Sequence, residues 1–177
     1  MATYEEKPER IWVTPPGPGG TKIRHIGMID IAYFYRWLQQ WFSFEFTWDP
    51  SFEKQYLEKV SSGSKEYQIK WECVMPARFN LKLGIDVNFL FLGVTEAETV
   101  ISGMKVKLQR GDFELRVDGY VEKNLEGLSF FRKIYQEFII RERIEEVAQE
   151  HYMKVKKFRD DVYAYINQYI RDEDVMI

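Results

Sequence analysis

The chain has 177 residues, 45% of them apolar and 30% charged, with a net charge of -3 at pH 7. This length predicts one soluble globular domain with a sizeable core, and the slightly negative charge disfavours nucleic acid or acidic lipid as a partner. Cys73 is the only cysteine, which excludes an internal disulfide, and the start of the chain is polar and acidic. These features predict a cytoplasmic protein, and because the sequence has no run of about 18 apolar residues we expect no membrane-spanning helix.

Residues 14–20, TPPGPGG, contain three prolines and three glycines and so break regular structure. They divide the chain into an arm and linker, residues 1–20, which we expect to be flexible, and a single α+β domain, residues 21–177. Within the arm, Ile11 to Val13 have strand-like side chains. This short stretch either docks on the domain as an edge strand or belongs to a mobile tail.

An aromatic-rich stretch, MIDIAYFYRWLQQWFSFEFTW, comes next. Asp30 is a candidate N-cap, and the apolar residues after it share one helical face. From Phe42 to Trp48 the apolar residues alternate with polar ones, which predicts a half-buried strand. Because the helix has few basic residues on its polar side, we expect it to pack in the core rather than on a membrane. Tyr33 and Trp37 lie off the apolar face and are candidate contacts for a partner.

From residue 65 to residue 123, apolar and polar residues alternate with a period of two. Short connections between such segments predict an antiparallel β-meander with one apolar face. We expect turns at Ser61–Ser64, Gly93, Ser102–Gly103 and Arg110–Asp112. The preceding residues 51–60 fit a helical stripe or a strand equally well.

The segment from residue 128 to residue 170 contains neither Pro nor Gly and is predicted to be helical. Its second part carries an apolar seam at heptad spacing. The seam consists of Ile144, Ala148, His151, Val155, Phe158, Val162, Tyr165 and Tyr169. One unbroken helix would be about 65 Å long, whereas a compact body of this size is about 40 Å across. We therefore expect the helix to break near residues 140–143 or to project past the sheet, where the seam would need a partner.

These elements predict an α+β fold. An antiparallel meander of five to six strands is packed by an N-terminal helix and by a long or broken C-terminal helical segment. The reason is that a sheet with one apolar face must cover that face, and both helical segments carry apolar stripes suited to doing so.

Side chains suited to catalysis or metal binding are scarce. The only histidines are His25, which we expect at the surface, and His151 in the seam. Cys73 lies on the apolar side of its strand, where cysteines are usually inert. A polar constellation could form only in space, from residues that all fall on the solvent side of their strands. One example is Asp86, Arg116 and Tyr120. We predict no catalytic, metal-binding or cofactor-binding residue, and a protein that is not an enzyme.

The segments KVKLQRGDFELRVDGYVEKN and FFRKIYQEFIIRERIEE resemble a family of archaeal proteins whose function is uncharacterised. In that family an aromatic-rich helix precedes a β-meander, and charged amphipathic helices follow. The resemblance covers roughly residues 28–170. It implies a stable cytoplasmic domain and no functional residues.

Two functions fit these patterns. The first is a non-enzymatic interaction or scaffold protein that self-associates through the C-terminal helices or binds a protein partner. Its candidate contacts are Tyr33, Trp37, His151, Phe158, Val162, Tyr165 and Tyr169. The alternative is a protein that binds a small apolar ligand, because the order strand, helix, meander and long helix is similar to that of the helix-grip carriers.

Overall fold

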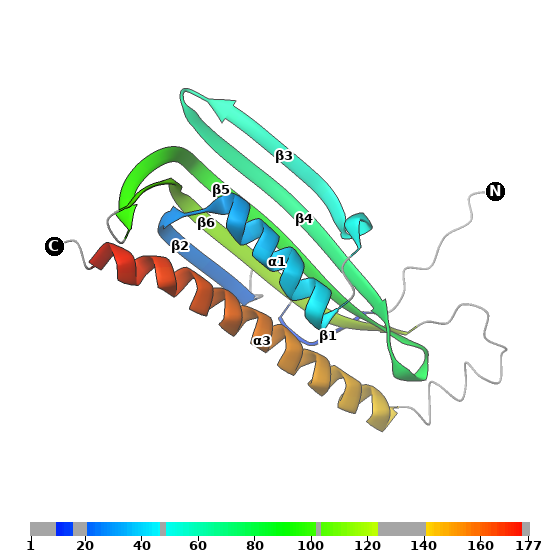
Figure 1. The fold of residues 1–177 in the computed structure, drawn as a ribbon. Coiled ribbons are helices and arrows are strands. Elements are labelled where there is room, and N and C mark those ends of the chain that lie inside the picture. The colour runs from blue at the N-terminus through cyan, green and yellow to red at the C-terminus, as the bar shows by residue number, and fades with distance from the viewer. Residues whose placement is uncertain (1–9, 16–20, 47–48, 102–103, 124–140, 175–177) are drawn as a thin grey trace, which may run out of the picture.

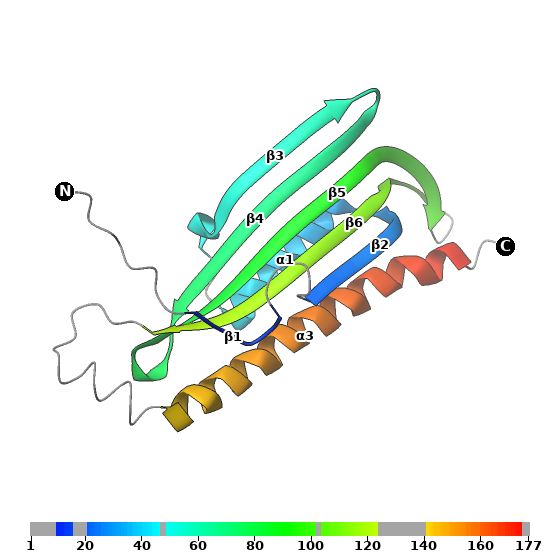
Figure 2. The same cartoon turned by 180° about the vertical axis from the view of Figure 1, so that it is seen from behind.

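The computed structural model describes residues 10–15, 21–46, 49–101, 104–123 and 141–174. It shows an α+β fold in which two α-helices lie on one face of a six-stranded antiparallel sheet (Figure 1 and Figure 2). The strands are β1 (Arg10–Trp12), β2 (Thr21–Ile29), β3 (Glu53–Ser61), β4 (Ser64–Pro76), β5 (Leu81–Ile101) and β6 (Met104–Lys123). The helices are α1 (Ile31–Glu45) and α3 (Arg141–Asp174), with short 3-10 helices η2 (Pro50–Phe52) and η3 (Arg78–Asn80) before β3 and β5.

The strand order is β1-β6-β5-β4-β3, and β2 also pairs with β6. Strands β3 to β6 form the predicted meander, because each is antiparallel to the next. Strands β1 and β2 lie end to end along one edge of β6, with Arg10 opposite Glu122 and Thr21 opposite Val117. The described part of the arm is therefore an edge strand, the first of the two alternatives.

Alternation along the strands turns one set of side chains toward the helices, where they form the main core. In β6, Phe113, Leu115 and Val117 are at most 1% exposed. Gly119 continues this series without a side chain, and a Cβ there would lie 2.7 Å from Val155 Cγ2 of α3. Glycine at this position thus allows α3 to lie close against the sheet.

Helix α1 begins where the sequence predicts. The Asp30 carboxylate accepts a hydrogen bond from the Tyr33 N–H (2.8 Å), which satisfies one of the free donors of the first turn. The buried residues of the helix are Phe34, Leu38, Trp41 and Phe42. They join α1 to the sheet and to α3, where Trp41 Nε1 donates to Asp161 Oδ2 (2.8 Å).

The strand predicted from Phe42 to Trp48 is wrong up to Glu45, because α1 continues to that residue. Helical periodicity turns Phe42 into the core and leaves Phe44 89% exposed, whereas a strand would place both on one face. The chain leaves the helix at Phe46, which is buried again. The last two residues of the predicted strand lie outside the described part of the chain.

Pairing with distant strands overrides several local signals. Residues 21–29 form β2, which the sequence did not predict, because β6 offers them a hydrogen-bonding edge. The turn predicted at Arg110–Asp112 is wrong, since these residues continue β6: all three pair with β2, and Arg110 and Asp112 also pair with β5. Gly93, with a φ of 60°, lies in a bulge of β5 instead of a turn. Residues 53–61 form β3, and the turn predicted at residues 102–103 lies outside the described ranges.

Helix α3 follows the same face of the sheet (Figure 1). Its 34 residues are about 51 Å long, whereas the 21 residues of β5 span about 70 Å. The expectation that the seam outruns the sheet therefore fails for the described helix, because the long strands make the body elongated rather than compact. The chain before Arg141, where a break was considered, is not among the described residues. None of the described helices is both long and apolar enough to cross a membrane.

Candidate ligand-binding cavity

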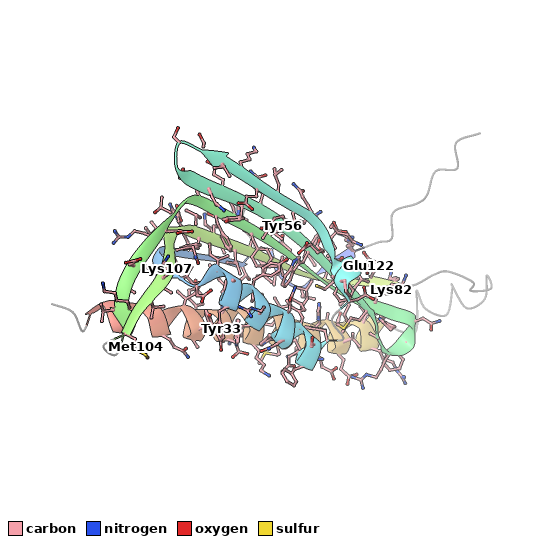
Figure 3. All side chains as sticks on the ribbon, turned by 45° about the horizontal axis from the view of Figure 1, so that its top comes forward. Tyr33, Tyr56, Lys82, Met104, Lys107 and Glu122 are labelled. Carbon is pink, nitrogen blue, oxygen red and sulfur yellow. The ribbon has the colours of Figure 1, made fainter. Side chains whose placement is uncertain are left out.

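An open cavity of about 880 Å³ lies between the first half of α1 and the strands β3 to β6. Its apolar walls are formed mainly by Ile31, Tyr35, Tyr56, Tyr67, Ile69 and Val94. Figure 3 shows Tyr56 on β3, across the cavity from α1. The volume lies within the range of about 300–1,000 Å³ that is usual for small-molecule sites.

Alternate side chains of β4 form the floor of the cavity, because they point to the same side of the sheet. Lys65, Tyr67 and Ile69 alternate with solvent-side residues, so all three point to the helix side of the sheet. The Tyr67 ring packs edge to face with Tyr56 of β3 and with Phe91 of β5, each at 6.4 Å between ring centroids. The aromatic part of the floor is therefore formed by Tyr56 and Tyr67 on two neighbouring strands, and Phe91 supports Tyr67 from within the core.

At one end of the cavity, Gln109 of β6 binds the start of α1. Its Oε1 accepts a hydrogen bond from the Ile31 N–H (3.0 Å). The bulge at Gly93 shifts the register of β5 beside this contact. Val94 and Glu96, which follow the bulge, both line the cavity. The bulge thus supplies one apolar and one acidic group to the wall.

The Tyr35 ring, another part of the wall, is fixed by a chain of hydrogen bonds. Its hydroxyl donates to Glu53 Oε2, and Trp71 Nε1 donates to the Tyr35 hydroxyl (3.0 Å). Trp71 is fully buried, so this contact satisfies an indole N–H that would otherwise be costly to bury. These hydrogen bonds therefore set the position of the Tyr35 ring in the cavity wall.

Charged groups surround the mouth of the cavity. Arg36 Nε donates to the Ala32 carbonyl (3.2 Å), and its guanidinium forms no ion pair with any residue in the described ranges. Lys65 pairs with Glu58 (2.9 Å), and the hydrogen bond between them raises the pKa of Lys65. Burial, and then the nearby Glu58, raise the pKa of Tyr56, so its hydroxyl stays neutral at physiological pH. An apolar interior with polar groups at its mouth can shield an apolar molecule and hold its polar end near solvent.

A second polar cluster lies on the other face of the sheet, because Tyr120 and Glu122 of β6 alternate with Gly119 and Val121, which face α3. Figure 1 and Figure 2 show both α-helices on that opposite side. Arg10 Nε donates to Glu122 Oε1 (2.7 Å), and its Nη1 lies 3.6 Å from Asp86 Oδ2. The Arg10 guanidinium is 4.1 Å from the centroid of the Tyr120 ring, and the Tyr120 hydroxyl donates to Asp86 Oδ1 (3.3 Å). Burial raises the pKa of Asp86 to about 6, although Arg10 opposes the shift.

This cluster contains two members of the constellation considered from the sequence. Asp86 and Tyr120 meet, but Arg116 donates from Nε to Glu114 Oε1 (2.6 Å) instead. The side chains of Arg10 and Trp12 from β1 cover Tyr120, with the Trp12 ring edge-on to Tyr120 at 5.3 Å between centroids. Because Arg10 of β1 pairs with Glu122 of β6 and Asp86 of β5, the cluster holds this edge strand beside β6.

The candidate partner residues on α3 lie in the core of their own chain. Those with described side chains are His151, Phe158, Val162 and Tyr165, and all four are buried. The side chain of Tyr169 lies outside the described set. Tyr33 is 55% exposed and Trp37 is half-buried, and both stack on Tyr165, at 6.2 and 4.8 Å between centroids. The described part of the seam thus joins α3 to the sheet and to α1.

The histidines and the cysteine are all buried. The surface position expected for His25 is wrong: this residue is 8% exposed and stacks on Phe113, because β2 lies under the helices. His151 Nε2 lies 2.8 Å from the Gly84 carbonyl oxygen, and burial lowers the pKa of His151. Cys73 is 1% exposed, and burial raises the pKa of its thiol far above the usual range. Within the described ranges, no group of three or more His, Cys, Asp or Glu residues is placed to hold a metal ion.

The sequence suggested an apolar-ligand site only by analogy, and it did not identify the lining of the cavity, which comes from five separate elements. The period-two pattern did place Tyr67 and Ile69 on the apolar side of their strand. Tyr56 could not be placed, since residues 51–60 fitted two kinds of structure. Gln109 and Arg36 gave no signal at all, because a polar residue on a strand or helix is ordinary in any sequence.

The chain matches no known protein-family model, and no curated protein is similar to it in sequence at a significant level. Its function is therefore inferred from the geometry of the described residues. Of their features, the cavity beside α1 has the chemical character of a binding site.

Proposed function

We propose that this protein binds a small, largely apolar molecule in the cavity between α1 and strands β3 to β6. The observation that carries the proposal is an open space of about 880 Å³ with an aromatic floor and apolar walls. Burial of apolar ligand surface on such walls provides the affinity, at about 25 cal/mol per Å² removed from water. The polar groups at the mouth, such as Arg36 and Glu96, orient the end of the ligand that remains near solvent.

The order of elements supports the same proposal. Strand β2, helix α1, the meander β3 to β6 and helix α3 follow the order that led us to compare the sequence with the helix-grip carriers. This is an argument from architecture, so it supports a ligand-binding function without identifying the ligand.

Self-association through the C-terminal helices, the other function considered, has less support from the geometry. It depended on a seam that lacks cover within the chain. The described seam residues instead pack on the sheet and on α1, as the burial of Phe158 and Val162 illustrates.

The proposal is tested with one probe and a matched pair of variants. The probe is 1-anilinonaphthalene-8-sulfonate, whose fluorescence rises in apolar sites, and native mass spectrometry of gently purified protein serves as a second measurement. Ala32→Trp places a large ring in the cavity wall, whereas Ala164→Trp places the same ring on an exposed position of α3 outside the cavity. We expect Ala32→Trp to weaken probe binding at least tenfold and Ala164→Trp to leave it unchanged. Equal binding by the two variants, or no binding by the unmodified protein, overturns the proposal.

A further inference from the structure

Strand β3 is an edge of the sheet, and no strand among the described residues lies on its outer side. The strand order ends at β3, and among the described residues only β4 pairs with it. Figure 1 and Figure 2 both show β3 at the outer border of the sheet, away from the two α-helices. Every residue of β3 after Glu53 is exposed, including Tyr56, Leu57 and Val60. Unpaired edges of this length are templates for pairing with another strand.

The turn between β3 and β4 determines which backbone groups of β3 face outward. Ser61 and Ser64 are opposite each other and enclose the two-residue turn Ser62–Gly63, both with positive φ. The residues that flank such a turn form a hydrogen-bonded pair, and pairs then alternate along an antiparallel hairpin. The N–H and C=O groups of Tyr56, Glu58 and Val60 therefore point away from β4. These are the groups that a further strand would meet.

The sequence of β3 is complementary to itself in one antiparallel register. When Glu53–Ser61 is paired over its full length with the same strand of a second molecule, Leu57 lies opposite Leu57 on the two-fold axis. Tyr56 then lies opposite Glu58, and Gln55 lies opposite Lys59, so no like charges face each other. The outward groups of Tyr56 also meet those of Glu58, as backbone hydrogen bonding requires.

Two of the other registers that keep side chains on matching faces bring like charges together. A shift of the partner in one direction puts Glu58 opposite Glu58, and a further shift puts Lys59 opposite Lys59, which are repulsive pairs at the centre. A shift in the other direction puts Tyr56 opposite Tyr56 and pairs Lys54 with Glu58, so opposite charges meet, but it pairs about seven residues of β3 instead of its full length. The charges on β3, which would discourage pairing with an unrelated strand, are thus compatible with a second copy of this chain.

We propose that two copies of this protein associate through antiparallel pairing of their β3 strands about an axis at Leu57, which joins the two sheets into one. The interface is small, so the dimer dissociates on dilution and is populated at high protein concentration. Tyr56 also lines the cavity, so Glu58 of the second copy extends the cavity rim. This inference does not depend on whether the cavity binds a ligand.

Cross-linking tests the register directly. Leu57→Cys puts one accessible thiol on the axis, because the native Cys73 is buried. Residues opposite each other in a non-hydrogen-bonded pair have Cα atoms about 4.5 Å apart, which is within reach of a disulfide. With oxidised glutathione as oxidant, we expect Leu57→Cys to form a covalent dimer. Gln55→Cys and Lys59→Cys are expected to cross-link with each other in a mixture but not alone.

The reversible dimer is measured by light scattering over a range of protein concentrations, with a matched pair of variants at residue 58. Glu58→Pro removes an N–H that faces away from β4, and proline is tolerated at such edge positions. Glu58→Ala removes the side chain and keeps the N–H. We expect Glu58→Pro to remain monomeric at concentrations where Glu58→Ala still forms dimers. A monomer at every concentration, or cross-linking of Gln55→Cys alone as fast as of Leu57→Cys, overturns the inference.

Discussion

The ring of Tyr120 in β6 lies across the backbone of Gly84 in β5, in the space that a side chain at residue 84 would occupy. Tyr120 is fully buried although it lies on the helix-free face of the sheet, because Arg10 and Trp12 of β1 cover it. A single glycine therefore allows a tyrosine ring to lie flat on the sheet, where the side chains of Arg10 and Trp12 pack on it.

Gly84→Ala is expected to destabilise the protein by about 1–3 kcal/mol, the usual cost of forcing a methyl group into a filled space. The change displaces the Tyr120 ring and weakens the contacts of Arg10. Urea unfolding followed by circular dichroism measures the loss. In a Tyr120→Ala background the same glycine substitution should cost much less, because the ring it displaces is gone. Equal costs in the two backgrounds would contradict the contact.

The Asp86 carboxyl should make stability depend on pH. Burial raises its pKa from 3.8 to about 6, so between these values the folded protein binds more protons than the unfolded chain. The free energy of unfolding should therefore fall as the pH rises from about 4 to about 6, by on the order of 3 kcal/mol. Asp86→Asn removes this titration. The difference in stability between the two proteins, measured by urea unfolding at each pH, should change across that interval, and a constant difference would show that Asp86 is not the group responsible.

His151 should change the pH dependence of stability in the opposite direction, so that the protein becomes less stable as the pH falls. Burial lowers its pKa below the usual 6.5, so the unfolded chain takes up a proton first as the solution is acidified. The stability that the neutral ring contributes is present above about pH 6.5 and is lost as the pH falls through its lowered pKa. His151→Leu should lower the free energy of unfolding by about 1 kcal/mol at pH 8, through loss of the hydrogen bond to Gly84. It should also abolish the loss of stability that protonation of His151 causes at lower pH. Thermal unfolding from pH 8 to pH 5 measures both effects, and a variant that loses stability on acidification as steeply as the parent would refute this role.

Phe42 and Phe44 differ sharply in their expected contributions. Phe42 is fully buried and packs against Trp71 and Phe158, so Phe42→Ala should cost about 3–5 kcal/mol. Phe44 is 89% exposed, so Phe44→Ala should change stability by no more than about 0.5 kcal/mol. Urea unfolding of both variants compares them directly. Similar losses in the two would indicate a strand here, with both rings on one covered face.

Much of the local structure could be predicted from the sequence because it depends on neighbouring residues. Asp30 caps α1 as expected, since an Asp side chain reaches the free N–H groups of the next turn. The alternation around Trp71 and Phe89 correctly separated a covered face from an open face of the sheet. Where two periods overlapped, as from Phe42 to Phe46, the alternation favoured a strand, and this prediction was wrong up to Glu45 because α1 continues to that residue.

The cavity could be predicted only in part. Tyr67 and Ile69 belonged to the predicted apolar face, but an apolar face is ordinarily filled by whatever packs on it. The open space arises because the first half of α1 leaves part of the β3–β4 hairpin uncovered. That relationship involves residues far apart in the chain, such as Ile31 and Gln109, and no local pattern records it.

By itself, the sequence determined where apolar side chains repeat, where α1 is capped and that the fold combines a meander with amphipathic helices. Only the tertiary structure decided that the α3 seam is covered by the chain's own sheet, that Arg110–Asp112 continues a strand, and that a cavity remains beside α1. The physical reason is that periodicity reports which side of an element avoids water, whereas the element that covers that side is selected by pairing and packing between distant segments.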